Sequence, residues 1–239
     1  MNLIQKGHRH THRGIIGIES AIVLIAFVIV AAALAFVVLN MGFSTTQKAK
    51  TAIIAAVEEA GSSLEVAGKI TAAGNPAGDQ LNATNIPIKI VSGGATSNLD
   101  GNFTSVKLVT SIAEYDNIYI QGPLIHGAFR NASMAWDQAV AKNWITVEQH
   151  PYSGNFALNP TQNTETPPNT IGIIYFTVNQ NNNTIIDIGE HAVLSVAYSF
   201  KDRPHSLDHV AWEISTPKGA PMTVDRTIPN ISTEIVDLG

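Results

Sequence analysis

Side chains with the potential for chemistry are few and scattered along this chain. The best metal candidates are two histidines and two aspartates that lie close in sequence: Asp202, His205, Asp208 and His209. Pro204 prevents a regular helix through this segment, and a strand is expected directly after it, so the two imidazoles need not share a face. Because ligand geometry rather than composition defines a metal site, we interpret these histidines as solvated loop residues and expect no bound metal.

The common signatures of catalysis are absent from the sequence. It contains no G-x-S-x-G, H-E-x-x-H or D-x-D-x-D-G motif and no Gly-rich loop between a strand and a helix. Trp136, Trp144 and Trp212 are more typical of core or interface anchors than of a platform that stacks a ligand. The sequence therefore predicts a protein that is not an enzyme and needs no cofactor.

Modification of asparagine is the chemistry with the most candidates. On a domain outside the membrane, an N-x-[ST] sequon is an acceptor for an oligosaccharide transferase. Chance occurrence in an Asn- and Thr-rich chain is the alternative, and the residues alone leave both open. Asn182 has the strongest case, since its QNNN segment is expected to form a hairpin loop. The five sequons begin at Asn82, Asn102, Asn131, Asn182 and Asn230.

The clearest structural element is an apolar segment that follows a short basic leader. No charged residue occurs between Glu19 and Lys48, and this stretch exceeds the roughly 20 residues with which a helix crosses a bilayer. It has no polar face, so lipid or other apolar helices must surround it. It also lacks the small-x-small exit of a cleaved secretory signal, which indicates that the helix is retained.

The helix is predicted to continue past the segment of membrane length. No proline interrupts it, and apolar residues step by three or four as far as Ala67. A helix from Ile16 to about Ala67 would be on the order of 75 Å long, too long for one bilayer and suited to a bundle. The basic leader predicts a cytoplasmic N-terminus with the rest of the chain outside.

Composition favours a protein made to pack. The chain has no cysteine, so disulfides and thiolate metal sites are excluded. Only 14% of its residues are charged and 45% are hydrophobic, which is poor in charge for a soluble protein and fits burial of a whole helix between subunits. The net charge of −5 argues against a nucleic-acid partner.

Beyond Gly74, short β-rich runs alternate with Gly, Asn, Pro, Ser and Thr. Regular short strands without alternating helices favour an immunoglobulin-like antiparallel β-sandwich. The predicted fold is therefore α+β, a long N-terminal hydrophobic helix followed by the sandwich, with a polar exposed loop from Asn155 to Thr170. Strands are expected at residues 86–91, 104–112, 117–120, 144–149, 172–178, 184–188, 191–200, 210–214 and 222–228.

The N-terminus resembles the class III signal sequence of type IV pilin-like proteins. Arg13 and Gly14 directly precede the apolar helix, and Gly17 and Glu19 are the third and fifth residues when Ile15 is the first of the mature chain. In that superfamily a membrane aspartic peptidase cuts after the glycine on the cytoplasmic side, and the helix is kept. The processing residues that this resemblance implies are Arg13, Gly14, Ile15 and Gly17.

Within the superfamily, the chain is most similar to archaeal flagellins, or archaellins. The similarity is carried by GIES at 17–20, the apolar run AIVLIAFVIVAAALAFVVLNMGF and TTQKAK at 45–50. A second match, STPKGAPMTVDRTIP at 215–229, resembles the closing pattern of the family. The leader departs from a compact Lys/Arg cluster, because histidines alternate with Arg9 and Arg13.

The resemblance implies a domain order of cleaved leader (1–14), filament-core and transmembrane helix (15–70) and outer β-sandwich (71–239). It implies a structural subunit of the archaeal flagellum filament, in which like helices pack in a central bundle for swimming motility. Archaellins are commonly N-glycosylated, which favours use of the sequons. The assembly residues expected on this helix are Glu19, Ile22, Leu24, Phe27, Leu34, Phe36 and Leu39.

Glu19 has a special place in this scheme. A carboxylate in an apolar bundle costs several kcal/mol unless it is paired or neutralised. The natural partner is the α-amine that cleavage creates at Ile15 of the same or a neighbouring subunit. The alternative is a glutamate in the first turn, where the helix dipole favours a negative charge.

The expected partners are copies of the chain or paralogous archaellins, a prepilin/preflagellin membrane peptidase, an assembly ATPase, membrane platform motor proteins and an oligosaccharide transferase. The expected location is the extracellular filament, with the precursor in the cell membrane. An adhesive type IV pilin shares the leader, helix and sandwich and is the main alternative. A membrane-anchored ligand-binding or hydrolytic ectodomain is a third possibility with few polar site signals.

Overall fold

A computed structural model describes residues 13–60, 64–120, 125–152 and 168–239 of the 239-residue chain. The chain divides into two units, Met1–Ala55 and Ala56–Gly239. Most of the predicted leader (1–14) and most of the predicted loop between Asn155 and Thr170 fall outside the described residues.

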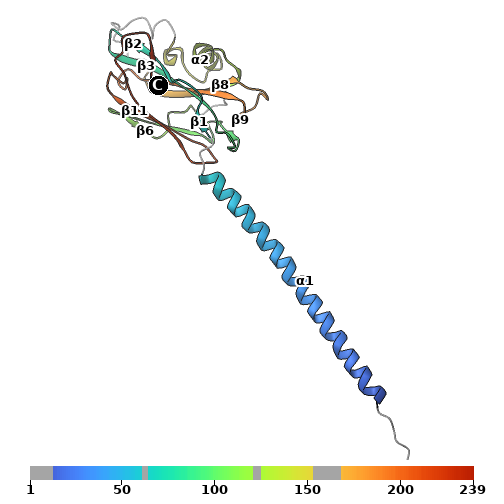
Figure 1. The fold of residues 1–239 in the computed structure, drawn as a ribbon. Coiled ribbons are helices and arrows are strands. Elements are labelled where there is room, and N and C mark those ends of the chain that lie inside the picture. The colour runs from blue at the N-terminus through green and yellow to red at the C-terminus, as the bar shows by residue number, and fades with distance from the viewer. Residues whose placement is uncertain (1–12, 61–63, 121–124, 153–167) are drawn as a thin grey trace, which may run out of the picture. The chain divides into compact units, whose positions relative to one another are not determined.

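Helix α1 spans Arg13–Ala60 and, at 48 residues, is about 72 Å long (Figure 1). Its sequence is rich in Ala, Ile, Leu and Val and contains no proline, so nothing interrupts the backbone ladder. The threonine hydroxyl groups in its second half donate hydrogen bonds to carbonyls of the preceding turn. Thr45 Oγ1 donates to the Met41 carbonyl and Thr46 Oγ1 to the Gly42 carbonyl, both at 2.8 Å.

The predicted continuation of this helix to Ala67, and of its domain to residue 70, is wrong. Helix α1 ends at Ala60, and Leu64–Val66 form strand β1, which pairs antiparallel with the sheet of the second unit. Gly-Ser-Ser at 61–63 is a weak helix-forming sequence. Leu64 is buried opposite Ile90, so long-range strand pairing and burial override the apolar periodicity that favoured a helix.

The second unit is built on a seven-stranded sheet. Its strand order is β13-β2-β3-β10-β8-β7, and β1 also pairs with β3. All pairs are antiparallel except β7 with β8, which are parallel. The strands are β1 (Leu64–Val66), β2 (Thr71–Asn75), β3 (Gln80–Ile90), β7 (Ile125–Ala128), β8 (Ile171–Val178), β10 (His191–Ala197) and β13 (Ile235–Asp237).

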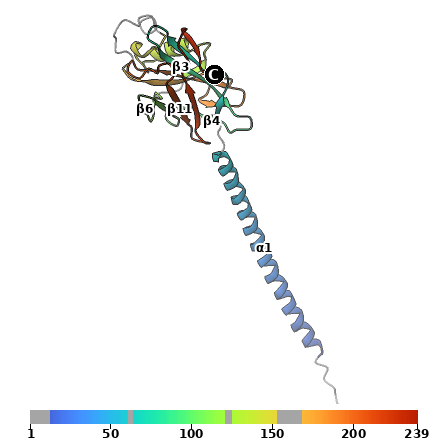
Figure 2. The ribbon, with the colours of Figure 1, turned by 60° about the vertical axis from the view of Figure 1, so that its left-hand side comes forward.

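A smaller sheet completes the sandwich (Figure 2). It has four antiparallel strands in the order β12-β11-β5-β6, and a separate pair joins β4 to β9. The strands are β4 (Ser97–Asn98), β5 (Ser105–Thr110), β6 (Glu114–Tyr115), β9 (Ile185–Ile186), β11 (His209–Ser215) and β12 (Met222–Thr227).

One hydrophobic core lies between the two sheets. It contains Ile86 and Leu194 from the large sheet and Leu108 and Trp212 from the small one, all without exposed surface. Facing sheets that bury such a shared layer form a β-sandwich. The prediction of a long apolar helix followed by a mostly antiparallel β-sandwich is therefore confirmed, with the β7–β8 pair as its parallel exception.

A second core covers the opposite face of the large sheet and was not foreseen. Helix α2, Ala132–Ala141, places Trp136 against Ile173 and Tyr175 of β8, and Trp136 Nε1 donates to Ser195 Oγ at 2.8 Å. Strand β8 therefore has buried residues on both faces, which explains its continuous apolar sequence. Helix α2 is short, and its stabilising contacts come from a strand far along the chain.

Two predicted strands near this layer are wrong. The segment 144–149 contains the 3₁₀-helix η1, Val147–Gln149, rather than a strand. Its Gln149 side chain accepts a hydrogen bond from the Thr146 amide at 2.9 Å, a local cap that competes with an extended chain. The segment 117–120 contributes only an isolated bridge, from Tyr119 to Gly172.

Candidate functional site

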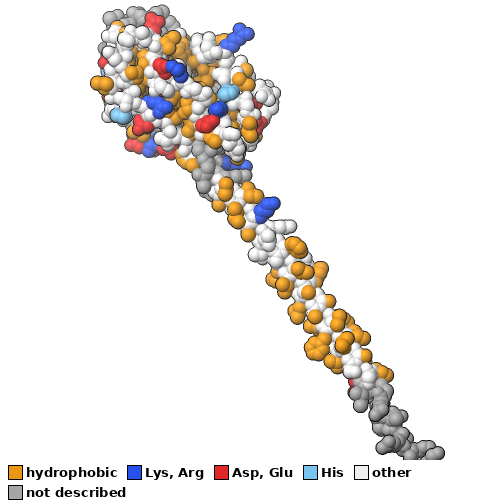
Figure 3. Space-filling view, in the orientation of Figure 1, with side chains coloured by type: hydrophobic (Ala, Val, Ile, Leu, Met, Phe, Trp, Pro, Cys, Tyr) orange, Lys and Arg blue, Asp and Glu red, His pale blue; other side chains and the backbone are white. Residues whose placement is uncertain are grey.

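The main candidate for a functional surface is the apolar exterior of α1. The segment Gly17–Val57 has a peak mean hydropathy of 3.4, and none of that apolar window is buried within the chain. Figure 3 shows hydrophobic side chains along the helix with few charges among them. The six apolar residues predicted for assembly expose between 61% and 73% of their surface: Ile22, Leu24, Phe27, Leu34, Phe36 and Leu39.

These side chains point in all directions around α1. Successive residues of an α-helix turn by about 100°, so Ile22, Phe27 and Leu39 lie on different sides. A water-facing helix would have one apolar stripe, but this one has no polar side over its first half. Its surface therefore needs lipid or several other apolar helices around it.

The predicted processing residues lie at the start of α1. The helix begins at Arg13, so the backbone of Gly14 and Ile15 is helical. Gly17 is also helical, and a Cβ built on it would contact nothing within 4 Å. Packing inside this chain therefore does not require a glycine at position 17. The remaining leader residues, 1–12, lie outside the described part of the chain.

Glu19 is exposed on the first turns of the described helix. Among the described side chains, the ion pairs all lie in the second unit and none includes Glu19. The hydroxyl of the next residue, Ser20, donates a hydrogen bond to the carbonyl of Gly17 at 3.1 Å. The geometry thus leaves the Glu19 carboxylate available to a partner outside the described chain.

Four of the five sequon asparagines are exposed: Asn102, Asn131, Asn182 and Asn230. Asn82 differs, because it is only 4% exposed and lies within β3. The exposure on which its prediction as a glycan acceptor rests is therefore absent in the folded domain. The physical reason is its place inside the seven-stranded sheet, where neighbouring strands flank β3 on both edges.

Asn182 lies in a well-anchored loop. Strand β8 pairs with β10, and β9 within the connection pairs with β4, so the predicted hairpin of β8 with β9 is wrong. The buried Glu190 carboxylate accepts hydrogen bonds from the amides of Gln180 at 2.7 Å and Asp187 at 3.0 Å. Asn182 itself has a φ of +55°, a turn conformation that asparagine tolerates.

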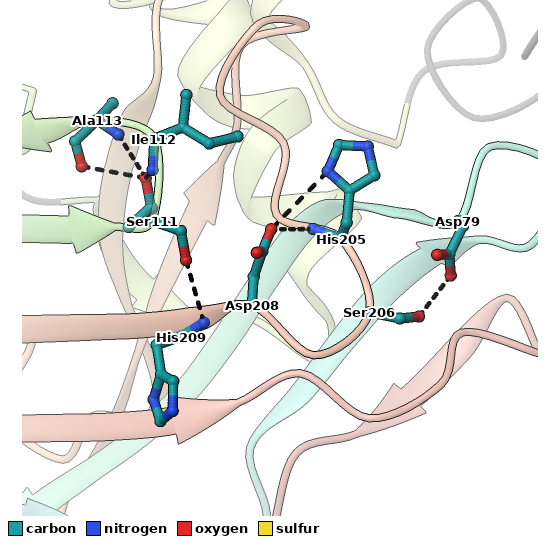
Figure 4. Close-up of polar contacts among 9 residues, drawn as sticks. Asp79, Ser111, Ile112, Ala113, His205, Ser206, Asp208 and His209 are labelled. Atoms are coloured by element: carbon teal, nitrogen blue, oxygen red, sulfur yellow. Dashed lines mark hydrogen bonds and ion pairs between the residues drawn. The ribbon is translucent and has the colours of Figure 1, made fainter.

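The two candidate metal-binding histidines do not converge. His205 lies 3.8 Å from Asp208 through Nδ1, whereas His209 Nδ1 lies 3.5 Å from Asp225 on the neighbouring strand β12. Figure 4 shows the two imidazole rings pointing in different directions. The turn between them contains Leu207 with a φ of +71°, which breaks the strand geometry. Among the described residues, no group of three or more His, Asp or Glu side chains is arranged to hold a metal ion.

Asp202 has a structural environment instead. Its buried Oδ2 accepts hydrogen bonds from Tyr115 Oη at 2.6 Å, Thr170 Oγ1 at 2.8 Å and Ser199 Oγ at 2.6 Å. Burial opposes ionisation of Asp202, but these hydrogen bonds outweigh it and hold its pKa below the usual value. The hydrogen bond from Tyr115 to Asp202, together with burial, raises the pKa of Tyr115 to about 12. The carboxylate thus links β6 of the small sheet to segments beside β8 and β10.

We expect Asp202→Asn to destabilise the sandwich by about 2 kcal/mol at neutral pH, because the three hydroxyls lose a charged acceptor. The midpoint of heat unfolding should fall by about 4–8 °C, measured by tryptophan fluorescence of filaments. Since the folded pKa of Asp202 is lowered, its contribution exists above the unfolded pKa of about 3.9 and disappears as pH falls through the folded value. The difference between variant and parent should therefore shrink below about pH 4.

The matched control is Asp116→Asn, an exposed aspartate in the same unit. It should leave the midpoint within about 1 °C of the parent. Equal effects of both substitutions would contradict the role given to Asp202.

A cavity beside the start of α2 was not predicted from the sequence. Two asparagines of β3, Asn82 and Asn85, line it together with Tyr152. A signal was present, because asparagine is depleted in strands and two occur within the run Gln80–Ile90. Without the strand pairing, however, that signal does not identify a cavity.

Comparisons with known proteins identify relatives over most of the chain. The family model described as archaeal-type flagellin matches residues 14–226. The chain is 34% identical to probable flagellin 1 of Aeropyrum pernix, with 91% of this chain and 92% of that protein covered. It is 27% identical to probable flagellin 2 of Archaeoglobus fulgidus, with 92% of each chain covered.

Two solved structures share the fold. The archaeal flagellum of Methanospirillum hungatei strain JF1 matches with a TM-score of 0.50 and 20% identity, over 93% of this chain and 99% of that chain. Archaeal flagellin FlaB1 from Methanocaldococcus jannaschii matches with a TM-score of 0.51 and 15% identity, over 73% and 95% of the two chains. The long helix followed by a mostly antiparallel sheet domain is thus a known combination.

Proposed function

The chain belongs to the archaeal-type flagellin family and is a structural filament subunit of the archaeal flagellum, and from this premise we propose that it polymerises through α1 to build a filament used for swimming. The observation that carries the proposal is the exposed apolar surface of α1, which has no polar side over its first half. The relatives and structures compared above are flagellins and flagella, and none of them favours an adhesive pilin or an anchored ectodomain.

Polymerisation exchanges lipid around α1 for like helices. Both surroundings are apolar, so cohesion comes from close packing of side chains rather than from transfer out of water. The exposed small and large residues of α1, such as Ala31, Leu34 and Phe36, offer surface for that packing. The β-sandwich then belongs to the outer shell of a surface filament, and the precursor belongs to the cell membrane.

Processing precedes assembly in this proposal. A membrane peptidase cleaves between Gly14 and Ile15 on the cytoplasmic side, which removes the basic leader and leaves α1 intact. An assembly ATPase and membrane platform proteins supply the work of extraction and rotation, while the subunit performs no catalysis. The match of the family model from residue 14 onward supports this division of the chain.

Glycosylation of the outer domain completes the proposal. An oligosaccharide transferase joins sugar C1 of a lipid-phosphate donor to asparagine Nδ2, breaks the C1–O bond to phosphate and releases the Nδ2 proton. Exposure supports the four acceptors Asn102, Asn131, Asn182 and Asn230. The burial of Asn82 speaks against it as an acceptor after folding.

We expect Glu19→Gln to lower filament yield by at least about tenfold, since the α-amine at Ile15 would lose its partner in an apolar bundle, a loss of about 3–5 kcal/mol. Glu19→Asp is the matched control because it keeps the charge, and it should assemble better than the glutamine variant. Yield is measured by quantifying sheared filaments against total processed subunit. A normal yield for Glu19→Gln would leave only the favourable position of a carboxylate at a helix N-terminus.

N-terminal sequencing and intact mass of sheared filaments test the function as a whole. A chain that starts at Ile15 and carries excess mass is expected, and deletion of the gene should abolish swimming. Full-length chain found only as dispersed membrane monomers would overturn the filament proposal. Intact swimming with lost surface attachment would point to the adhesive pilin instead.

A further inference from the structure

A cavity of about 420 Å³ lies beside the start of α2 in the second unit. Its volume falls within the range of about 300–1,000 Å³ that is typical of ligand pockets. Strands β2 and β3 form one wall, Asn131–Ser133 another, and Pro151 and Tyr152 a third, with Glu234 and Ile235 completing the lining. All of these residues belong to the sandwich unit.

A β-bulge places an asparagine in this cavity. Ala73 of β2 pairs with Ala83 of β3, and Gly74 pairs with Leu81, so Asn82 is left opposite no residue of β2. A bulge of this kind interrupts the alternation of side chains and redirects one of them. Asn82 and Asn85, three positions apart, consequently line the same cavity.

The two asparagines carry unused hydrogen-bonding capacity. Asn82 is 96% buried, and its Oδ1 has no hydrogen-bond partner among the described residues. Asn85 Oδ1 is also without one there, while Asn85 Nδ2 donates to Tyr152 Oη at 2.8 Å. A buried carbonyl oxygen left unpaired is costly, so the pair calls for a ligand that brings hydroxyl donors.

The charge of the lining narrows the ligand class. Among the described residues that line the cavity, none is Lys, Arg or His, and Glu234 is the one with a carboxyl side chain. Phosphate and other anions are therefore poorly matched. Amide and hydroxyl groups beside the ring of Tyr152 suit a neutral ligand with many hydroxyls, such as a sugar.

An attachment point for sugar lies at the edge of the same cavity. The whole Asn131-Ala132-Ser133 sequon belongs to the lining. Asn131 caps α2, because its Oδ1 accepts a hydrogen bond from the Met134 amide at 3.0 Å. That bond uses the side-chain oxygen, whereas a glycan is attached to Nδ2, so capping and glycosylation are compatible.

We propose that the cavity holds the protein-proximal sugars of a glycan attached to Asn131, with hydroxyls of the sugar donating to Asn82 and Asn85. The inference rests on the proposed glycosylation of the outer domain and adds to it a specific seat for one glycan. The sugar then joins the start of α2 to β3 and covers the two buried carbonyl oxygens.

Mild periodate oxidation of sheared wild-type filaments tests this seat, because periodate cleaves only accessible vicinal diols. The glycopeptides around Asn131, Asn102 and Asn182 are quantified by mass, in intact filaments and after denaturation. The Asn131 glycan should react about tenfold more slowly in intact filaments, the factor expected if it leaves the cavity about one-tenth of the time. The other two should react within about twofold of their denatured rates.

Three variants separate the cavity from other sources of protection and stability. Asn85→Leu removes one acceptor and should bring the Asn131 glycan to the rate of the exposed ones. Ser133→Thr keeps the sequon and is the matched control, with protection retained. Ser133→Ala removes the glycan but keeps the Asn131 cap, so its heat-unfolding midpoint should fall by about 3 °C relative to Ser133→Thr.

The outcomes distinguish this proposal from glycosylation in general. A glycan on Asn131 that reacts as fast as the others overturns the seat and leaves glycosylation standing. Sugar at the other sequons but none on Asn131 does the same. Protection that persists in Asn85→Leu filaments assigns it to a neighbouring subunit and overturns the seat. Absence of sugar at every sequon overturns both proposals.

Discussion

Replacement of Gly14 by valine is expected to leave full-length precursor in the membrane and to abolish filaments. Resemblance to class III signal sequences puts the scissile bond between Gly14 and Ile15. Glycine lets the backbone approach catalytic carboxylates closely, and a β-branched side chain on the residue before the cut would obstruct that approach.

Failure of cleavage has a large effect because of what remains attached to α1. The leader carries Lys6, Arg9 and Arg13 together with histidines. Placing these charges at the end of an apolar helix bundle costs several kcal/mol for each unpaired charge, and the α-amine at Ile15 is never formed. Assembly should therefore fall below detection rather than be reduced in part.

Immunoblotting of membrane and sheared fractions measures this result, since precursor and mature chain differ by 14 residues. Gly14→Ala is the matched control, because a single methyl group is the smallest obstruction and some mature chain should still form. A second control, Gly42→Ala, lies far from the cut and should be cleaved and folded normally, as a Cβ there meets no atom within 4 Å. Mature-length Gly14→Val subunits in filaments would show that the cut lies elsewhere.

Leu34→Arg is expected to have a comparably large effect at a later step. Leu34 lies near the middle of the uncharged stretch from Ser20 to Gln47 and is 61% exposed on α1. An arginine at the centre of an apolar helix costs about 3 kcal/mol, and inside a bundle of identical helices each copy would meet other copies. At about 1.4 kcal/mol per factor of ten, subunit addition weakens more than a hundredfold.

The prediction requires that the variant still reaches the membrane. We therefore expect processed Leu34→Arg chain in the membrane fraction and none in sheared filaments, measured by quantitative immunoblotting. Leu34→Met conserves volume and apolarity and should assemble at close to the parent yield. Filaments of Leu34→Arg at normal yield would mean that this side of α1 faces water rather than neighbouring helices.

Local features were predictable because local sequence determines them. A run of Ala, Val, Ile and Leu with no charge and no proline has only one low-energy state away from water, which is a helix with all its backbone groups paired. Sequons and leader residues are contiguous motifs and need no fold to be read. Period-two runs such as Val210–Ile214 and Met222–Ile228 identified β11 and β12 for the same reason.

Long-range pairing decided the remainder. Leu64 continues the helical periodicity of α1 but lies in β1, where it pairs with Ile90 of β3, because burial in the sheet outweighs local propensity. Helix α2 depends on contacts of Trp136 with a strand that follows it by some forty residues. Strand β8 looks like one apolar run because two different cores cover its faces.

The site residues divide in the same way. The apolar surface of α1 and the sequence of each sequon follow from the chain alone, since composition and adjacency define them. Whether a sequon asparagine is exposed does not, and Asn82 is buried only because β3 lies inside the large sheet with a bulge at that residue. Asp202 likewise meets Tyr115, Thr170 and Ser199 only through tertiary packing. Contacts between distant segments depend on strand order and register, which short patterns do not contain.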